Sequence, residues 1–291
     1  MSAQPAHRFT ADTTSAAALR AAFERDGYLL IEDFVEADAC ERLIERADAI
    51  VDAFDPTGVA TIFSTRDAGH AAAEYFQTSG DKIRCFFEAD AFDENGHLRH
   101  AKALSINKIG HALHDLDPVF NAFSRTPRLK ALAATLGLRQ PLLLQSMYIF
   151  KPPHIGGEVG WHQDSTFLYT EPESVIGFWF ALEDATLENG CMMALPGRHN
   201  EPLKQRFRYG ENGLGMETLD ATPWSDGPEV ALEAPRGSLV VLHGRLPHYS
   251  GPNRSSQSRH AYTLHVIDGA CAYPKDNWLR RGAELPLRGF D

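Results

Sequence analysis

The sequence predicts one mainly β domain, a sandwich or barrel, with helices from the N-terminal third packed on it. Short strand-like runs separated by Gly, Pro, Asn and Asp fill the chain after Gln140, which is typical of sandwiches and barrels. Before that point, apolar residues recur at spacings of three and four, as in amphipathic helices. The length of 291 residues is within the range of one such domain. We therefore treat residues 1–291 as a single domain with a helical N-terminal part.

The N-terminal elements are expected in the order helix, strand, helix. Residues 16–25 form a short amphipathic stretch, and residues 28–31 are a short apolar run typical of a strand. Apolar side chains from 40 to 54 then line one helix face. A later helix is expected from Pro127, a favourable first-turn residue, to Gly137, and a turn at residues 93–96.

The second half is expected to supply most of the strands. Residues 198–235 interrupt the strand pattern and are expected to form a long insertion over one face, as lids often do. The expected strands cover residues 142–144, 147–150, 175–182, 191–195, 238–242 and 261–266.

Composition excludes some classes of partner and indicates a compartment. A net charge of -11 disfavours a role centred on nucleic acid or an anionic membrane, since both need a concentrated positive surface. The four cysteines form no CxxC motif, and no run approaches the ~18 apolar residues of a membrane helix. The first ten residues do not resemble a signal peptide, and the last three are not a Ser-Lys-Leu type ending. We expect a cytoplasmic protein.

A candidate metal site begins at His162-Gln163-Asp164. Residues two apart on a strand point to the same face, so the imidazole and the carboxylate can face one cation. The His-x-acid pattern alone is weak, because about two such pairs arise by chance in this composition. The second pair, His199 and Glu201, lies in a Pro- and Gly-bounded turn and is a poorer candidate.

A second histidine would complete the two-His-one-carboxylate triad, which leaves open positions on Fe(II). His243 ends the expected strand 238–242, and His248 follows five residues later. Arg259 lies eleven residues beyond His248, just before the next expected strand. The far carboxylate of 2-oxoglutarate needs such a buried cation, which Arg can supply through two parallel hydrogen bonds. This offset favours His248, and His243 remains the alternative.

Motifs along the chain resemble the phytanoyl-CoA dioxygenase family of Fe(II)/2-oxoglutarate oxygenases. The resemblance runs from about Tyr28 to Trp278, and the combination of motifs is more specific than the HxD core. The matching segments are Gly80–Arg84, Ser105–His111, Gln145–Lys151, Gly156–Val159, His162–Asp164, Phe167–Pro172 and Glu183–Gly190.

The resemblance implies a double-stranded β-helix, the jelly-roll fold of the cupin-like proteins, with helices outside. It implies that His162, Asp164 and His248 bind the iron and that Arg259 binds the co-substrate carboxylate. Trp161 stands where the family resemblance leads us to expect proline, which affects substrate contacts and not the metal. Further positions implied to line the co-substrate pocket are Lys108, Met147, Gln163, Trp179 and Ser250.

Some of these residues have simpler interpretations. Lys108 can be an ordinary exposed lysine, and Trp179 can be a core residue. His111 and His114 are interpreted as structural. A basic cluster in the insertion can meet the phosphates of a CoA thioester or can be a solvated loop face; it consists of Lys204, Arg206 and Arg208.

The implied function is a dioxygenase that uses Fe(II), 2-oxoglutarate and O2 to hydroxylate a small or medium organic substrate, with release of succinate and CO2. The protein orients the partners and excludes water, so no catalytic side chain beyond the metal ligands is expected. The alternatives are an acyl-CoA 2-hydroxylase of the phytanoyl-CoA type, a cupin-like metalloenzyme that does not use 2-oxoglutarate, and a non-catalytic metal-binding jelly-roll module. Fold alone cannot separate them.

Overall fold

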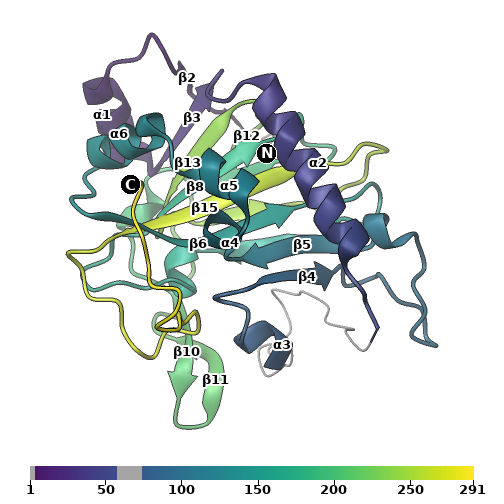
Figure 1. The fold of residues 1–291 in the computed structure, drawn as a ribbon. Coiled ribbons are helices and arrows are strands. Elements are labelled where there is room, and N and C mark those ends of the chain that lie inside the picture. The colour runs from purple at the N-terminus through teal and green to yellow at the C-terminus, as the bar shows by residue number, and fades with distance from the viewer. Residues whose placement is uncertain (1–3, 58–73) are drawn as a thin grey trace.

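The computed structural model describes residues 4–57 and 74–291, which form two β-sheets with helices over the outer face of the larger one (Figure 1). In the described residues the larger sheet has eight strands, in the order β2 (Arg8–Thr10), β3 (Tyr28–Glu32), β13 (Leu239–His243), β8 (Ile176–Ala181), β15 (Ala261–Asp268), β6 (Pro141–Ile149), β5 (Ile106–His111) and β4 (Ile83–Phe87). The smaller has five, in the order β1 (Gln4–Pro5), β12 (Val230–Leu232), β9 (Met192–Ala194), β14 (His248–Ser250) and β7 (Val159–His162).

The helices begin and end where local chemistry favours it. Ser15 caps the first helix by accepting from the Ala18 amide, and Gly27 ends it with a φ of 79°. Proline occupies the first turn of two later helices, where its missing N–H costs nothing. The helices are α1 (Ala16–Asp26), α2 (Ala37–Ala53), α3 (Glu74–Gln77), α4 (Leu113–Leu116), α5 (Pro118–Ser124) and α6 (Pro127–Thr135), with 3-10 turns η2 (Lys102–Leu104), η3 (Asp164–Thr166) and η4 (Arg198–Asn200).

The strands β3, β8 and β13 of the larger sheet are buried on both faces, so they lack a polar side. On β3, Leu29 and Ile31 pack against the helices, while Tyr28 and Leu30 pack between the two sheets. The same alternation continues on β8, where Phe178 contributes to the helix-side core. The continuous apolar runs in the sequence follow from this double burial.

Most predicted elements match the structure within a few residues. The helices expected at 16–25, 40–54 and 127–137 and the strand at 28–31 are present as α1, α2, α6 and β3. The two runs at 142–144 and 147–150 were predicted as separate strands, which is wrong: they form the single strand β6. Gln145 and Ser146 interrupt the apolar pattern of the sequence without ending the strand, because both are buried polar residues inside it.

Segment 198–235 contains a hairpin that belongs to neither large sheet. Its strands, β10 (Gln205–Gly210) and β11 (Gly213–Thr218), form a separate two-stranded sheet that projects beyond the large sheets, and one isolated bridge joins Arg208 to Asn277 (Figure 1). The same segment also supplies β12, which pairs with β9 of the smaller sheet. The hairpin reaches the site through Phe207, whose ring lies 5.8 Å from that of Phe167.

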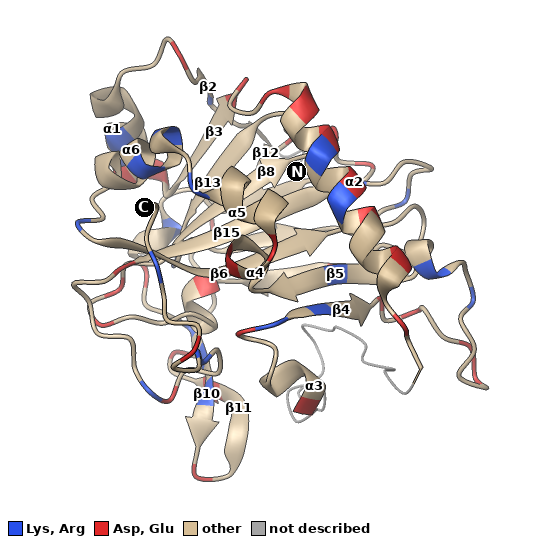
Figure 2. Ribbon diagram, in the orientation of Figure 1, with Lys and Arg blue, Asp and Glu red and all other residues tan. Residues whose placement is uncertain are grey.

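Charged residues of both signs are distributed along the elements, and both occur on the outer side of α2 (Figure 2). In the described part of the chain, no helix is long and apolar enough to span a bilayer.

Candidate metal centre

Strand pairing brings two of the predicted ligands together. β7 and β14 are antiparallel neighbours, and His162 lies directly opposite His248 in their register. Directly opposite residues on adjacent strands point to the same face. The two imidazole rings consequently have centroids only 4.1 Å apart.

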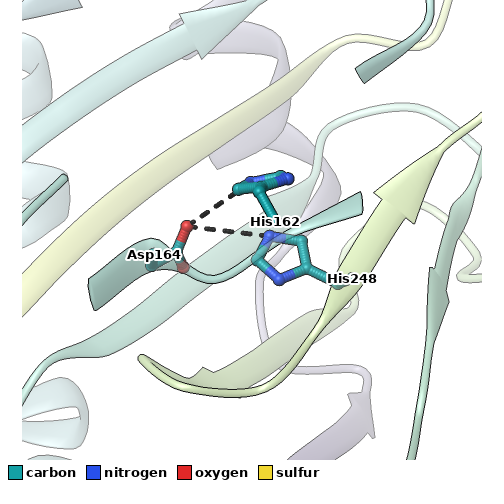
Figure 3. A group of neighbouring side chains, drawn as sticks. All are labelled: His162, Asp164 and His248. Atoms are coloured by element: carbon teal, nitrogen blue, oxygen red, sulfur yellow. Dashed lines mark ion pairs between the residues drawn. The ribbon is translucent and has the colours of Figure 1, made fainter. Parts of the chain in front are cut away.

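Asp164 completes the group from the start of η3. Gln163 is extended, with φ of -118° and ψ of 134°, so the two-residue alternation expected of a strand holds up to Asp164. The carboxylate Oδ1 lies 3.7 Å from His162 Nε2 and 3.6 Å from His248 Nε2 (Figure 3). One ligand atom from each of the three residues lies within 4.8 Å of the others, a spacing that can hold one metal ion.

The donor set fits a divalent metal. His162 Nδ1 lies 2.8 Å from the Gly160 carbonyl and His248 Nδ1 lies 3.0 Å from the Leu246 carbonyl. These bonds put the proton on Nδ1 and leave each Nε2 lone pair toward Asp164. Burial, and then the charge of His248, lower the pKa of His162 to about 4, so its neutral, ligand-competent form prevails at pH 7.

The competing candidates lie elsewhere. His243 accepts a hydrogen bond from the Arg245 amide, and its ring packs 5.0 Å from that of His199. His199 in turn contacts the Glu24 carbonyl, so neither it nor Glu201 joins the metal group. The structure therefore brings His248, and not His243, to the His162–Asp164 pair.

A cavity of about 160 Å³ adjoins the three residues and contains Arg259. The Arg259 side chain is 2% exposed, and its Cζ lies 5.2 Å from the centre of the Trp179 ring. Among the residues that the structure describes, no carboxylate pairs with it and its Nε has no hydrogen-bond partner. Burial lowers the pKa of Arg259 to about 10, which still leaves it charged at pH 7. A buried cation without a protein anion fits a carboxylate ligand.

Two buried lysines line the same cavity. Lys108 is 6% exposed, so the exposed-lysine interpretation is wrong, and its Nζ lies 4.0 Å from Met147 Sδ. Lys151 is 2% exposed and donates to Ser250 Oγ at 2.9 Å and to the Gly157 carbonyl at 2.6 Å. Burial lowers the pKa of each lysine to about 7. The cavity therefore has a cationic end formed by both lysines and Arg259.

Other residues implied by the resemblance divide into two groups. Met147, Trp179 and Ser250 line the cavity. Gln163 does not: its amide donates to the Arg245 carbonyl and accepts from the Lys204 amide, on the opposite side of the chain. The alternation that brings His162 and Asp164 together is the reason that Gln163 points away.

Two histidines interpreted as structural are buried. His114 contacts Ser146 Oγ and Asp115, away from the cavity. His111 contacts Ser79 Oγ but also lines the cavity, beside an aromatic wall. In that wall Phe76 stacks on Trp278 with ring centroids 4.6 Å apart.

Sequence reasoning missed two residues of the site. Lys151 stands in a segment used for the resemblance but received no role. His265 lines the cavity, and its Nε2 lies 3.2 Å from Asp164 Oδ2. Alternation could have placed His265 on the cavity face, since it is six residues from Arg259. Lys151 follows the end of β6 with a φ of 43°, so alternation does not place it.

Comparison with known proteins agrees with this geometry. The family model "Phytanoyl-CoA dioxygenase (PhyH)" matches residues 23–261. A phytanoyl-CoA dioxygenase of Arabidopsis thaliana is 46% identical over 265 residues, covering 91% of this chain and 93% of that protein. The sequence motifs also point to the group called phytanoyl-CoA dioxygenase domain-containing protein 1, and the Mus musculus protein of that name is 45% identical over 275 residues, covering 91% of this chain and 94% of that protein.

Among solved structures, EctD from S. alaskensis with 2-oxoglutarate and 5-hydroxyectoine superposes with a TM-score of 0.61. The superposition covers 92% of this chain and 84% of EctD at 22% sequence identity, so it is evidence for the fold only. The predicted double-stranded β-helix is confirmed.

Proposed function

The chain belongs to the phytanoyl-CoA dioxygenase family, and from this membership we propose that it hydroxylates a small or medium organic substrate while converting 2-oxoglutarate to succinate and CO2. The family consists of non-haem iron oxygenases that depend on 2-oxoglutarate, and this chain is one of them. The observation that carries the proposal is the adjacency of the His162–Asp164–His248 group to the buried Arg259, which pairs with no carboxylate among the described residues.

Each part of the site has a role in this proposal. His162 and His248 hold Fe(II) through Nε2, and Asp164 holds it through Oδ1. Arg259 binds the far carboxylate of 2-oxoglutarate in the cavity of about 160 Å³ that the metal group also lines. When bound, the iron supplies the activation of O2 that is coupled to decarboxylation of the co-substrate. Lys108, Met147, Trp179 and Ser250 complete the proposed co-substrate pocket.

The aromatic wall supports an uncharged, apolar part of the substrate near the metal. Phe167 lies beside the metal group, with its ring 6.2 Å from that of His162. Phe76 and Trp278 continue the apolar surface along the cavity. The cationic end lies with Arg259 and suits the dicarboxylate, so the two ends of the cavity favour different molecules. Such apolar walls also exclude water from the reacting atoms.

The basic cluster gives little support for a CoA thioester. Lys204 Nζ lies 2.6 Å from Asp220, and Arg206 lies 3.1 Å from Asp276. Arg208 pairs with both Glu217 and Asp276, at 2.6 and 2.7 Å. Phosphates would have to compete with carboxylates that already neutralise all three cations. We therefore favour the small-substrate proposal over the acyl-CoA alternative.

The four cysteines are free thiols in the structure, which supports the expected location in a reducing compartment such as the cytoplasm.

Succinate formation tests the proposal directly. The purified chain is given Fe(II), O2 and 2-oxoglutarate, alone and with candidate small substrates, phytanoyl-CoA or shorter acyl-CoA thioesters. Without added substrate we expect slow succinate formation. An apolar small molecule should stimulate it, with an equal amount of hydroxylated product. Asp164→Ala should form neither succinate nor hydroxylated product. A chain that binds metal but never consumes 2-oxoglutarate would be a non-catalytic module. Strong turnover that depends on acyl-CoA would show that the acyl-CoA alternative, which the family name suggests, is correct.

A further inference from the structure

The two oxygens of Asp164 face different groups. Oδ1 faces the Nε2 atoms of His162 and His248, at 3.7 and 3.6 Å. Oδ2 faces His265 Nε2, at 3.2 Å. His265 is 5% exposed and Asp164 8%, so water competes little for this contact. The carboxylate is thus divided between the candidate metal position and one further imidazole.

The larger sheet directs His265 to this position. On β15 the odd-numbered Thr263 and His265 line the cavity, while Tyr262, Leu264 and Val266 pack in the helix-side core. The pairing of β15 with β6 shifts at this point: His265 pairs with Gln145 and Val266 with Leu143. The extra residue, Leu144, belongs to β6, so β15 keeps its regular alternation and His265 stays on the cavity face.

Gly177 provides the space for the contact. It lies directly opposite His265 in the register of β8 and β15. A Cβ at this position would lie 3.0 Å from Asp164 Oδ2 and 3.5 Å from His265 Nε2. Any side chain at position 177 would therefore press on the two atoms that meet.

We propose that His265 is a positioning residue for the metal centre: its Nε2–H donates to Asp164 Oδ2 and leaves Oδ1 alone to bind the metal. This inference rests on the iron site of the proposed function. A charged acceptor makes the bond strong, and it fixes the carboxylate before the metal arrives.

The tautomer follows from the surroundings of the ring. His265 Nδ1 is buried and has no hydrogen-bond partner among the described residues. A proton on Nδ1 would bury an unpaired donor and turn the Nε2 lone pair toward a carboxylate. The Nε2–H tautomer avoids both costs.

Metal titration of the full chain tests the inference without turnover. Co(II) is titrated into the parent, His265→Leu and His265→Gln, with the affinity and the visible d–d spectrum of bound Co(II) as readouts. We expect the leucine variant to lose about ten- to a hundredfold in Co(II) affinity and to change the spectrum. The glutamine variant, whose amide reaches near the position of Nε2, recovers part of both.

His114→Leu is the matched control, since it also removes a buried, hydrogen-bonded histidine but lies outside the cavity. We expect it to lower the unfolding midpoint and keep the Co(II) affinity. If His265→Leu does not fold, Gly177→Ala presses on the same contact from β8 and is expected to lower the affinity similarly.

The possible failures are distinguishable. A parent chain that binds no Co(II), Mn(II) or Fe(II) contradicts the metal centre and the proposed function. Tight binding by the parent, with equal affinity in folded His265→Leu, contradicts only the role of His265. Glutamine and leucine variants that behave alike contradict the donor role.

Discussion

In the proposed function, Arg259 is the residue on which we expect co-substrate binding to depend most. It is buried, charged at pH 7 and without a carboxylate partner in the described chain. We expect Arg259→Ala to weaken 2-oxoglutarate binding by some hundredfold or more, since removing one partner of a buried charge pair typically costs about 3–5 kcal/mol. Metal affinity should change little. Parallel titrations of metal and 2-oxoglutarate measure both, and equal 2-oxoglutarate affinity in variant and parent removes Arg259 from the pocket.

The two cavity lysines predict a pH dependence. Burial lowers the pKa of Lys108 and Lys151 to about 7, so both lose charge as the pH rises from 6 to 8.5. A neutral lysine attracts a dicarboxylate less, and 2-oxoglutarate affinity should therefore fall over this range. We expect Lys108→Met and Lys151→Met each to flatten part of the slope, and the double variant to flatten most of it. Calorimetric titrations at several pH values measure the slope, and a parent affinity that does not vary with pH contradicts the prediction.

Side-chain alternation explains which residues the sequence could place. His162, Asp164, His248 and Arg259 combine distinctive chemistry with simple spacing, and the structure brings all four to one cavity. Gln163 was expected in that cavity because of its place in the motif, although alternation alone points it away. Alternation from Arg259 places His265 on the cavity face, but its contact with Asp164 depends on the β8–β15 register that sets Gly177 opposite it, and this register is not visible in the sequence.

At the scale of elements, the unpredicted segments are those with an irregular sequence pattern. β5 carries the buried polar residues Lys108 and His111 among apolar ones, so it does not look like a core strand. α5 has only seven residues, too few for a helical period, and is defined by its Asp117 cap and by Pro118. The structure of these segments depends on strand pairing and on the cavity, which the local sequence pattern does not show. In contrast, α2 has a full amphipathic pattern that predicts a helix.

The short helix α4 carries a buried charge cluster that holds several elements together. The Asp115 side chain is fully buried and pairs with Arg125 at 2.6 Å, Arg281 at 3.0 Å and Arg288 at 2.9 Å. We expect Asp115→Asn to lower the free energy of unfolding by about 3–5 kcal/mol, because it leaves buried cations without their anion. Urea unfolding measures the change.

Asp38→Asn is the control for this cluster, because its pair with Arg42 on α2 is exposed. We expect a much smaller change there.

Burial raises the pKa of Asp115, but the hydrogen bond and charge of His114 and the arginines outweigh it and hold the pKa below the ordinary 3.8. Its contribution to stability is therefore present above pH 4 and lost as the pH falls further. An Asp115→Asn chain as stable as the parent at pH 7 contradicts this role.

At the scale of the whole molecule, the site lies where the two sheets meet. The smaller sheet supplies His162 and His248, and the segment that leads into β15 of the larger sheet supplies Arg259. Asp164 connects them through its contact with His265 on β15. A ligand that binds these residues therefore bridges both sheets, and its binding free energy adds to the stability of the fold.

We therefore expect the metal and then 2-oxoglutarate to stabilise the fold in two successive steps. Mn(II) at a hundred times its Kd should stabilise the fold by about 2.7 kcal/mol and raise the unfolding midpoint by about 5 °C, with a further rise when 2-oxoglutarate is added. Thermal unfolding in the absence of O2 measures both increments. Asp164→Ala should lose the metal increment, while Arg259→Ala should keep it and lose the second, because the two residues hold different ligands. A second increment that persists in Arg259→Ala would mean that 2-oxoglutarate binds elsewhere, and a parent chain that Mn(II) does not stabilise would contradict a metal site between the sheets.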